Sequence, residues 1–242
     1  MERKLNLVVR QGDRAQRGQG TRAGLDLAKV VAAGRSLGGA AITMQAVADA
    51  LGVDRKTINH YVGDKDQLLR LAALTSFREA TESRELPRTA DWKELCRSFA
   101  TMMVDALVAT EEFARHLKVD AEFVALLVDP LEMLAARMGE AGFDDEATIR
   151  CLAQLSNLCV SFAADVASKD EGPTRPELLR AGLQLHGRRT ERPASDHLTL
   201  ARAAASAPDT YARDQFAFAL EIFIAGVEAV VVRRASTYVP LH

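Results

Sequence analysis

Residues 43–68 read TMQAVADALGVDRKTINHYVGDKDQL, and this stretch decides how the first part of the chain folds. Apolar residues at helical spacing after Thr43 predict a short helix, and the Thr43 hydroxyl can cap its first turn. Gly52 follows the last apolar residue of that helix and permits a sharp turn. The stretch therefore begins with a capped helix that ends in a tight glycine turn.

Another helix is expected directly after this turn. Asp54 occupies the N-cap position, and Val53 and Ile58 have the spacing of a hydrophobic staple, so the helix should extend to about Tyr61. Two short helices joined by a glycine turn are typical of a helix-turn-helix, in which the second helix enters the major groove of DNA. The pattern therefore predicts a nucleic-acid-binding module.

A further helix should precede this pair, from about Thr21 to Ser36. It should end at Gly38 and Gly39, because glycine accepts the positive φ of a helix C-terminus. We expect the Gly-, Gln- and Arg-rich residues before Arg22 to be mobile. The module then consists of three helices behind an N-terminal extension.

Beyond the module, helical patterns follow one another. Asp64 and Gln67 form a capping-box pattern that opens a long helix, which should end near Glu85, just before Pro87. Further helices are expected from Trp92 to Ala106, from the N-cap Asp129 and Pro130 to near Gly142, from Asp145 to Ser168, from Glu177 to Leu185 as a short helix inside a long and partly mobile connection, and from Thr210 to about Arg234.

Composition supports an all-α fold. Of the 242 residues, 48% are hydrophobic and 26% are charged, as in ordinary soluble globular chains. Alanine occurs 41 times and aromatic residues make up only 5%, which favours helices over sheets. We therefore expect an all-α protein in which a three-helix helix-turn-helix domain is followed by a helical bundle.

The net charge of −2 is the sum of two unlike parts. Residues 1–77 contain twelve Lys and Arg and seven Asp and Glu, a net charge of +5, which leaves −7 for residues 78–242. A basic head on an acidic body is typical of a nucleic-acid module joined to a domain that does not bind DNA. Residues 43–65 are themselves neutral, so the positive charge lies mainly in the extension and the first helix. The extension is either a solvated tail or an arginine arm that follows the DNA backbone or enters the minor groove.

No segment has the character of a membrane span, because Glu221 and Glu228 interrupt the longest apolar run, Phe216 to Val232. The apolar patch near the N-terminus is too short for a secretory signal. Cys151 and Cys159 lie too far apart along one expected helix to bridge each other, so reduced thiols are expected. We therefore expect a cytoplasmic protein that does not contact membranes.

The last expected helix is apolar on nearly every side apart from a stripe of Asp214, Glu221 and Glu228. Such a helix needs two packing partners. One is the core of its own domain, and the other is most simply the same helix of a second subunit across a two-fold axis. The pattern therefore predicts a homodimer.

The quoted stretch resembles the DNA-binding domain of the TetR family of bacterial transcription regulators. The matching positions are Thr43, Ala48, Leu51, Gly52, Val53, Thr57, Tyr61, Lys65 and Leu68. The rest is similar to the family in outline, and Asp91, Trp92 and the late apolar helix resemble the branch of the tetracycline repressors. The resemblance implies a flexible basic extension at residues 1–21, a helix-turn-helix domain at 22–69, and a helical effector-binding and dimerisation domain at 70–242.

The resemblance also implies a set of DNA-binding residues. Thr43 and Lys65 would hold phosphates and Tyr61 would lie against the DNA backbone, whereas the exposed residues of the recognition helix would face base edges. The full set is Thr43, Arg55, Lys56, Thr57, Asn59, His60, Tyr61 and Lys65. The chain departs from the family at Asn59, where tyrosine is common. Asparagine suits bidentate pairing with adenine, which predicts base reading in place of the usual backbone contact.

An effector pocket inside the body is a further implication of the resemblance. The candidate lining residues are Trp92, Phe99, Met103, Phe113, His116, Phe123, Asn157 and Phe162. Apolar residues at helical spacing are also what an ordinary core requires, and at any single position that interpretation is favoured. For His116, capping a helix end is favoured over anchoring a ligand.

We expect neither enzyme activity nor a metal or cofactor, because the HExxH, GxSxG and phosphate-binding glycine motifs are missing and the five histidines are scattered. The expected function is that of a TetR-like repressor. It would bind a palindromic double-stranded DNA operator as a homodimer and be released by a small-molecule effector. Two alternatives stay open: a helix-turn-helix regulator without a small-molecule effector, controlled by a protein partner, and an all-helical binding protein or enzyme that has lost operator recognition.

Overall fold

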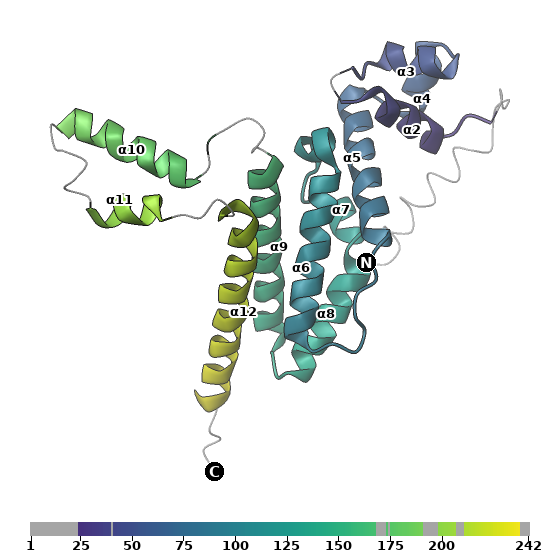
Figure 1. Cartoon of the computed structure of the whole chain (residues 1–242). Coiled ribbons are helices and arrows are strands. Elements are labelled where there is room, and N and C mark those ends of the chain that lie inside the picture. The colour runs from purple at the N-terminus through teal and green to yellow at the C-terminus, as the bar shows by residue number, and fades with distance from the viewer. Residues whose placement is uncertain are drawn as a thin grey trace. The chain divides into compact units, whose positions relative to one another are not determined.

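The computed structural model describes residues 24–39, 41–167, 173, 175–190, 198–206 and 211–237. Every regular element in these ranges is a helix, which confirms the all-α prediction (Figure 1). The chain divides into two compact units, and the division falls between Ala72 and Ala73, inside helix α5 (Lys65–Glu82). The expected mobility of the residues before Arg22 concerns a segment outside the described residues.

The first unit contains α2 (Leu27–Leu37), α3 (Met44–Leu51), α4 (Arg55–Tyr61) and the beginning of α5. The predicted start of the first helix at Thr21 is wrong, because α2 begins at Leu27. Gly24 has a φ of 61°, and Asp26 is the N-cap, whose carboxylate accepts a hydrogen bond from the Lys29 backbone N–H at 2.8 Å. A capping aspartate thus sets the start of this helix.

The end of α2 and the start of α3 follow the predictions. Gly38 has a φ of 76° directly after α2. Thr43 is the N-cap of α3, and its hydroxyl oxygen accepts a hydrogen bond from the Ala46 backbone N–H at 3.0 Å. Gly52 adopts the left-handed conformation with a φ of 65°, which an L side chain rarely adopts.

Side-chain caps also begin the next two helices, as predicted. Asp54 accepts a hydrogen bond from the Thr57 backbone N–H at 2.8 Å and caps α4. Before α5, Asp64 accepts from the Gln67 N–H at 2.8 Å, and the Gln67 side chain accepts from the Gly63 N–H at 2.7 Å. The reciprocal contact is that of a capping box, displaced by one residue from its usual place at the N-cap.

The small core of the first unit is fully apolar. Val30, Val47, Ile58 and Leu68 have no exposed surface, so each helix contributes a buried side chain. Gly34 faces Leu68, and a Cβ atom added at Gly34 would lie 3.3 Å from the Leu68 Cδ1 atom. The glycine therefore permits the close approach of α2 to α5 within this unit.

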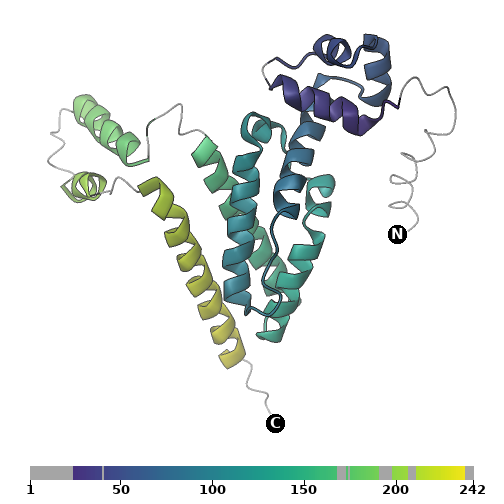
Figure 2. The same ribbon diagram turned by 45° about the vertical axis from the view of Figure 1, so that its right-hand side comes forward.

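The second unit is a helical bundle followed by a helical pair and a long last helix. After the remainder of α5, its elements are α6 (Trp92–Ala109), the 3-10 helix η1 (Glu111–His116), α7 (Ala121–Ala125), α8 (Val128–Glu140), α9 (Asp145–Ala167), α10 (Arg175–Thr190), α11 (Leu198–Ala205) and α12 (Tyr211–Thr237). Helix α6 packs against α8, α9 and α12, and α12 lies beside α9 (Figures 1 and 2). Helices α10 and α11 pack against each other.

Several predicted boundaries in this unit are wrong. Helix α5 ends at Glu82, three residues before the predicted end. Helix α8 begins at Val128 with Leu127 at the N-cap position, so Asp129 is not the cap. Asp129 lies instead in the first turn, where its negative charge complements the positive end of the helix dipole.

The predicted connection between α9 and α12 is also more helical than expected. Helix α10 extends from Arg175 to Thr190, beyond the predicted Glu177 to Leu185 on both sides, and α11 was not predicted. The prolines and polar residues of this region favoured an irregular connection. The alanine-rich sequence of α11, LTLARAAA, is the signal that favours a helix there.

The core of the bundle is formed mainly by side chains of α6, α8 and α9, and α5, α7 and α12 add further buried side chains. Its largest fully buried members include Phe99, Met103, Leu134, Met138 and Leu155. Three aromatic pairs belong to the core or pack against it, with ring centroids 5.0 Å apart for Trp92 and Phe143, 4.8 Å for Phe77 and Phe123, and 4.7 Å for Phe162 and Phe216. Burial of this apolar surface is the main force that holds the bundle together.

Candidate nucleic-acid interface and effector pocket

Helix α4 presents a continuous polar face. Arg55, Lys56, Asn59 and His60 are all exposed, and the spacing of four residues places Arg55 beside Asn59 and Lys56 beside His60. This face offers a guanidinium, an ammonium, an amide and an imidazole group. Arginine, lysine and asparagine side chains pair with base edges in the major groove. Ile58 is buried on the opposite side and packs α4 into its unit.

The N-terminus of α4 is held by a carboxylate that stays ionised. The backbone N–H of Thr57, followed by its side chain, lowers the pKa of Asp54 below the ordinary value of 3.8. Because Asp54 is charged at neutral pH, it complements the positive end of the α4 dipole. Thr57 is half-buried. Its backbone N–H therefore has a local role in capping, and its place in the DNA-binding set stays a prediction.

Tyr61 has a contact that the sequence did not reveal. Its hydroxyl donates a hydrogen bond to the Leu25 carbonyl at 2.8 Å, across 36 residues of sequence, and its ring meets the His60 ring edge-on at 5.8 Å. The single hydroxyl proton is thereby used inside the unit. In this structure Tyr61 fixes the end of α4 to the segment before α2, and its hydroxyl does not also have a proton to donate to a phosphate.

Thr43 and Lys65 lie at the starts of α3 and α5, respectively, and both are exposed. Helix N-termini attract phosphate because their first N–H groups and the helix dipole favour negative charge. Both positions are therefore suited to the predicted phosphate contacts. The Thr43 hydroxyl oxygen is occupied by the Ala46 N–H, which leaves its proton for another acceptor.

The predicted effector residues occupy three different environments. Five are buried members of the body core or its edge: Trp92, Phe99, Met103, Phe113 and Phe123. His116 and Phe162 are half-buried, and Asn157 is exposed. Burial is required both of core residues and of residues that line an internal pocket, so the effector set stays a prediction.

A pocket of about 520 Å³ lies elsewhere in the body. It is a surface pocket bordered by the C-terminal end of α5, the 83–90 connection, Met102 of α6, and the segment that joins α7 to α8. The lining residues are Arg78, Thr81, Glu82, Arg84, Glu85, Leu86, Arg88, Met102, Ala125, Leu126, Val128, Asp129, Pro130 and Met133. No residue of the predicted effector set is among them within the described part of the chain.

The connection that forms one wall of this pocket is fastened at two points. Arg84 Nη1 lies 2.6 Å from Asp105 Oδ2 on α6. The Arg137 guanidinium on α8 donates to the Arg88 carbonyl at 2.7 Å, and it also pairs with Glu140 at 2.6 Å. These contacts hold the wall in place between α6 and α8.

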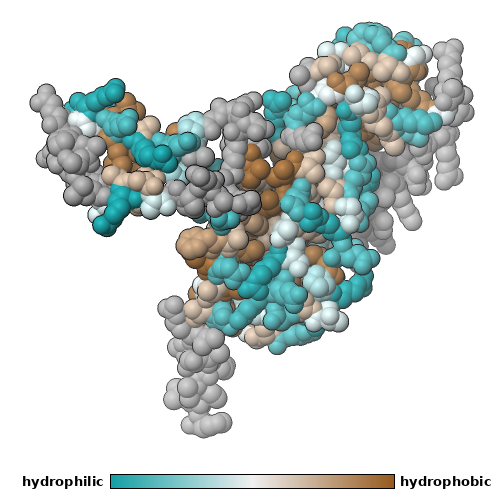
Figure 3. Space-filling view, viewed as in Figure 1, coloured by the Kyte–Doolittle hydropathy of each residue, from teal (hydrophilic) through white to brown (hydrophobic). Residues whose placement is uncertain are grey.

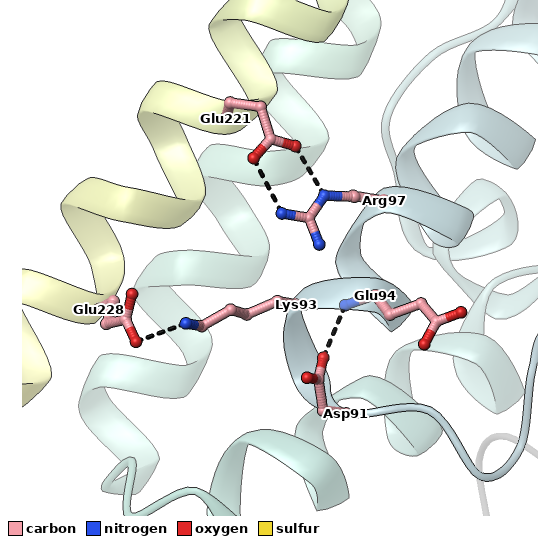
Figure 4. A network of polar contacts seen from close by, with 6 residues as sticks. All are labelled: Asp91, Lys93, Glu94, Arg97, Glu221 and Glu228. Atoms are coloured by element: carbon pink, nitrogen blue, oxygen red, sulfur yellow. Dashed lines mark hydrogen bonds and ion pairs between the residues drawn. The ribbon is translucent and has the colours of Figure 1, made fainter.

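Helix α12 is tied to α6 by two ion pairs, Arg97 with Glu221 and Lys93 with Glu228 (Figure 4). Two acidic residues of the predicted stripe thus face basic residues of the same chain. On the same helix, Phe218, Ile222 and Val230 remain 63%, 57% and 48% exposed. Hydrophobic side chains are visible at the surface where α9 and α12 lie (Figure 3).

The described residues contain neither a membrane-spanning helix nor a metal site. Within the described ranges, no helix is long and apolar enough to cross a membrane. Among the same residues, no group of three His, Cys, Asp or Glu could hold a metal ion.

Comparison with known proteins identifies the body. Residues 86–231 match the family model described as "Tetracyclin repressor-like, C-terminal domain". No curated protein matches the chain.

Solved structures share the fold at low sequence identity. A possible TetR family transcriptional regulator from Streptomyces coelicolor A3(2) has a TM-score of 0.64 and 22% identity, over 85% of this chain and all of that one. ActR from Streptomyces coelicolor, in complex with actinorhodin, has a TM-score of 0.59 and 23% identity, over 86% of this chain and 97% of that one. A single-residue variant of TetR from Acinetobacter baumannii AYE, in complex with minocycline, has a TM-score of 0.59 and 19% identity, over 85% and 98%. Since the family model covers more than half of the sequence, the chain belongs to the TetR family of transcription regulators.

Proposed function

We propose that this protein is a transcriptional repressor that binds a palindromic DNA operator as a homodimer and is released from it by a small molecule. The observation that carries the proposal is the exposed polar face of α4, presented by a capped helix-turn-helix in a chain of the TetR family. A helix with this surface and this support is suited to the major groove.

In the proposed complex, α4 reads the operator. Arg55, Lys56, Asn59 and His60 face base edges, and Asn59 pairs with adenine through its amide. Thr43 and Lys65 contact phosphates at the starts of α3 and α5. Thr57 supports the start of the recognition helix, and Tyr61 supports its end through Leu25. In this proposal six of the eight predicted positions contact DNA, and Thr57 and Tyr61 support the recognition helix.

The proposed dimer forms through α12. Phe218 and Ile222 lie one helical turn apart and are more than half exposed, which is unfavourable for large apolar side chains in water. A second copy packed across a two-fold axis would cover them. In the dimer, the two α4 helices would lie about 34–36 Å apart and enter successive major grooves.

The proposed effector binds in the body. Two proteins of similar fold were solved with bound small molecules, ActR with actinorhodin and the TetR variant with minocycline. Helix α5 is common to both units of this chain, so it is the natural mechanical link between effector and recognition helix. A coupling free energy of about 1–3 kcal/mol between the two ligands would release the operator.

A gel-shift titration with the DNA upstream of its own gene tests operator binding. We expect a complex that survives excess nonspecific DNA and is lost when Arg55 and Asn59 are both replaced by alanine. A wild-type protein that binds this DNA no better than random DNA would contradict the proposed operator recognition.

A metabolite and drug panel then tests release. A true effector at a hundred times its Kd raises the free energy of unfolding by about 2.7 kcal/mol, which thermal shift detects, and it should also dissociate the gel-shift complex. If no compound in a broad panel does either, control by a protein partner replaces the small-molecule part of the proposal.

A further inference from the structure

The pocket beside the 83–90 connection combines an apolar floor with a charged rim. Its floor includes Met102, which is only 4% exposed, with Leu126, Pro130 and Met133 around it. Methionine side chains are flexible and polarisable, so they adapt to ligands of different shape. The volume of about 520 Å³ lies inside the range of roughly 300–1,000 Å³ that small-molecule sites occupy.

The charges of the rim balance. Its six charged residues are Arg78, Arg84, Arg88, Glu82, Glu85 and Asp129, three of each sign. Arg78 Nε lies 3.8 Å from Glu82 Oε1, and Arg84 pairs with Asp105 outside the lining. The Arg78 and Glu82 side chains are 52% and 69% exposed, so the rim stays in contact with solvent. A charged group that reached the apolar floor would lose hydration there without meeting an excess of the opposite charge.

The rim nevertheless offers strong hydrogen-bonding groups of both kinds. Guanidinium groups only donate, and carboxylates only accept. A ligand that satisfies both must itself contain an acceptor, such as a carbonyl oxygen, and a donor, such as a hydroxyl or N–H group. The two attachments of the connection, through Arg84 and through the Arg88 carbonyl, keep these groups in place before a ligand arrives.

We infer that this pocket binds an uncharged, mainly apolar molecule that carries both hydrogen-bond donors and acceptors. The inference rests on the proposed function in one respect, since such a molecule would be the effector. It assigns the effector site to the α5, α6 and α8 side of the body and not to the buried aromatic set around Phe99 and Met103.

Two fluorescent probes with one aromatic body test the inference on the full chain without DNA. N-phenyl-1-naphthylamine is uncharged and has an N–H donor, and 1-anilinonaphthalene-8-sulfonate adds one negative charge to the same body. In a fluorescence titration, the uncharged probe should bind the wild-type protein severalfold more tightly than the sulfonate. Equal or tighter binding of the sulfonate would overturn the inference.

A substitution that fills the pocket tests whether the uncharged probe binds there. Ala125→Trp puts an indole into the pocket wall, whereas Ala136→Trp adds the same group at an exposed position of α8 outside the lining. Binding of the uncharged probe should be lost in the first variant and retained in the second, with both variants showing the helical content of the wild type. An unchanged titration in Ala125→Trp would mean that the probe binds elsewhere and that the pocket is not the site.

Substitutions that change the net charge of the pocket lining test whether that charge selects the ligand. Glu85→Gln makes the lining net positive and should tighten sulfonate binding, and Arg88→Gln makes it net negative and should weaken it. The uncharged probe should respond little to either change. Glu146→Gln and Arg150→Gln, which separate an ion pair on α9, serve as matched controls outside the pocket. If the control variants shift sulfonate binding as much as the pocket variants do, the rim charges do not select the ligand.

The outcomes of these titrations are independent of operator binding. If the uncharged probe does not bind but the gel shift is normal, the proposed pocket is contradicted and the proposed DNA recognition stands. If the probe binds as expected but no operator complex forms, the pocket is supported and the proposed repressor function is contradicted.

Discussion

Arg97 and Glu221 form a two-point ion pair between α6 and α12, with Nε 2.6 Å from one carboxylate oxygen and Nη2 2.8 Å from the other (Figure 4). The residues are 124 positions apart in sequence. Lys93 and Glu228 repeat the contact two turns further along α12, with Nζ 2.5 Å from Oε1. The pairs explain why an otherwise apolar last helix carries glutamates, because these fix one of its faces to its own bundle.

We expect the contribution of this pair to depend on pH and salt. Arg97 lowers the pKa of Glu221 below its ordinary value of 4.5, chiefly through the hydrogen bond. A carboxylate with a lowered pKa in the folded state stabilises the protein above the ordinary value, and this effect is lost as the pH falls through the lowered pKa. Glu221→Gln should therefore reduce the melting temperature slightly at pH 7, less so in high salt, because both side chains are exposed. The difference between variant and wild type should vanish in acid; a constant difference from pH 7 to pH 3 would contradict the assignment.

The exposed apolar face of α12 should control oligomeric state. Phe218→Glu and Ile222→Glu each put a charge where the proposed dimer buries an apolar side chain, so either variant should yield monomers in sedimentation velocity. Val119→Glu is the matched control, because Val119 is 68% exposed in the segment between η1 and α7. Dimers that persist in both α12 variants would place the interface on another surface.

Base reading and phosphate binding should be separable by two substitutions. Asn59→Ala should remove discrimination at one operator position, worth about 1–3 kcal/mol for a bidentate contact. Lys65→Ala should weaken binding to all sequences and reduce the slope of affinity against salt by about one unit. Selection from random DNA and titrations at several salt concentrations measure the two effects. Loss of selectivity in the lysine variant, with none in the asparagine variant, would reverse the proposed roles.

The turn between α3 and α4 should be sensitive to any Cβ atom. Gly52→Ala should lower the free energy of unfolding by about 1–2 kcal/mol, because the left-handed backbone at a φ of 65° is strained for L residues. A Cβ there would meet no described atom within 4 Å, so the cost comes from the backbone alone. Gly52→Asn should cost less.

Gly139 in α8 serves as the contrasting control. It is helical, and no described atom lies within 4 Å of an added Cβ, so Gly139→Ala should stabilise the protein by about 0.5–1 kcal/mol. Urea unfolding of the three variants would show whether the signs differ as expected.

The cysteines should differ in reactivity. Burial raises the pKa values of Cys96 and Cys159 to about 12, and both thiols lie in the core of the body. Only the thiolate reacts with alkylating agents, so iodoacetamide at pH 8 should modify the half-buried Cys151 first in the native protein. Mass spectrometry should show one adduct on the folded chain and three in urea. Early modification of Cys96 or Cys159 would show that the core opens readily.

The first unit follows closely from sequence because local contacts decide its elements. Thr43, Asp54 and Asp64 each accept a hydrogen bond from an N–H three residues later, and Gly52 meets a conformational demand of its own position. Contacts of this range are visible in a short stretch of sequence. The predicted start of the first helix at Thr21 is wrong because the Asp26 cap sets the start of α2 at Leu27.

The polar face of α4 was equally accessible to sequence reasoning, because Ile58 defines the buried side of α4 and the exposed residues follow from helical periodicity. The role of the Tyr61 hydroxyl was not, since its acceptor is 36 residues away. In the body, the sequence identifies the aromatic residues as apolar. It does not show which of them pack in the core and which would contact a ligand.

By itself, therefore, the sequence determined α3 and α4, the caps of α3, α4 and α5, the glycine turn and the polar face of α4, because each depends on residues within about one helical turn. Only the tertiary structure decided the partner of Tyr61, the attachment of α12 through Arg97 and Glu221, and the pocket formed by segments from Arg78 to Met133. These features join groups that lie far apart along the chain, and their positions are set by the packing of whole helices against one another.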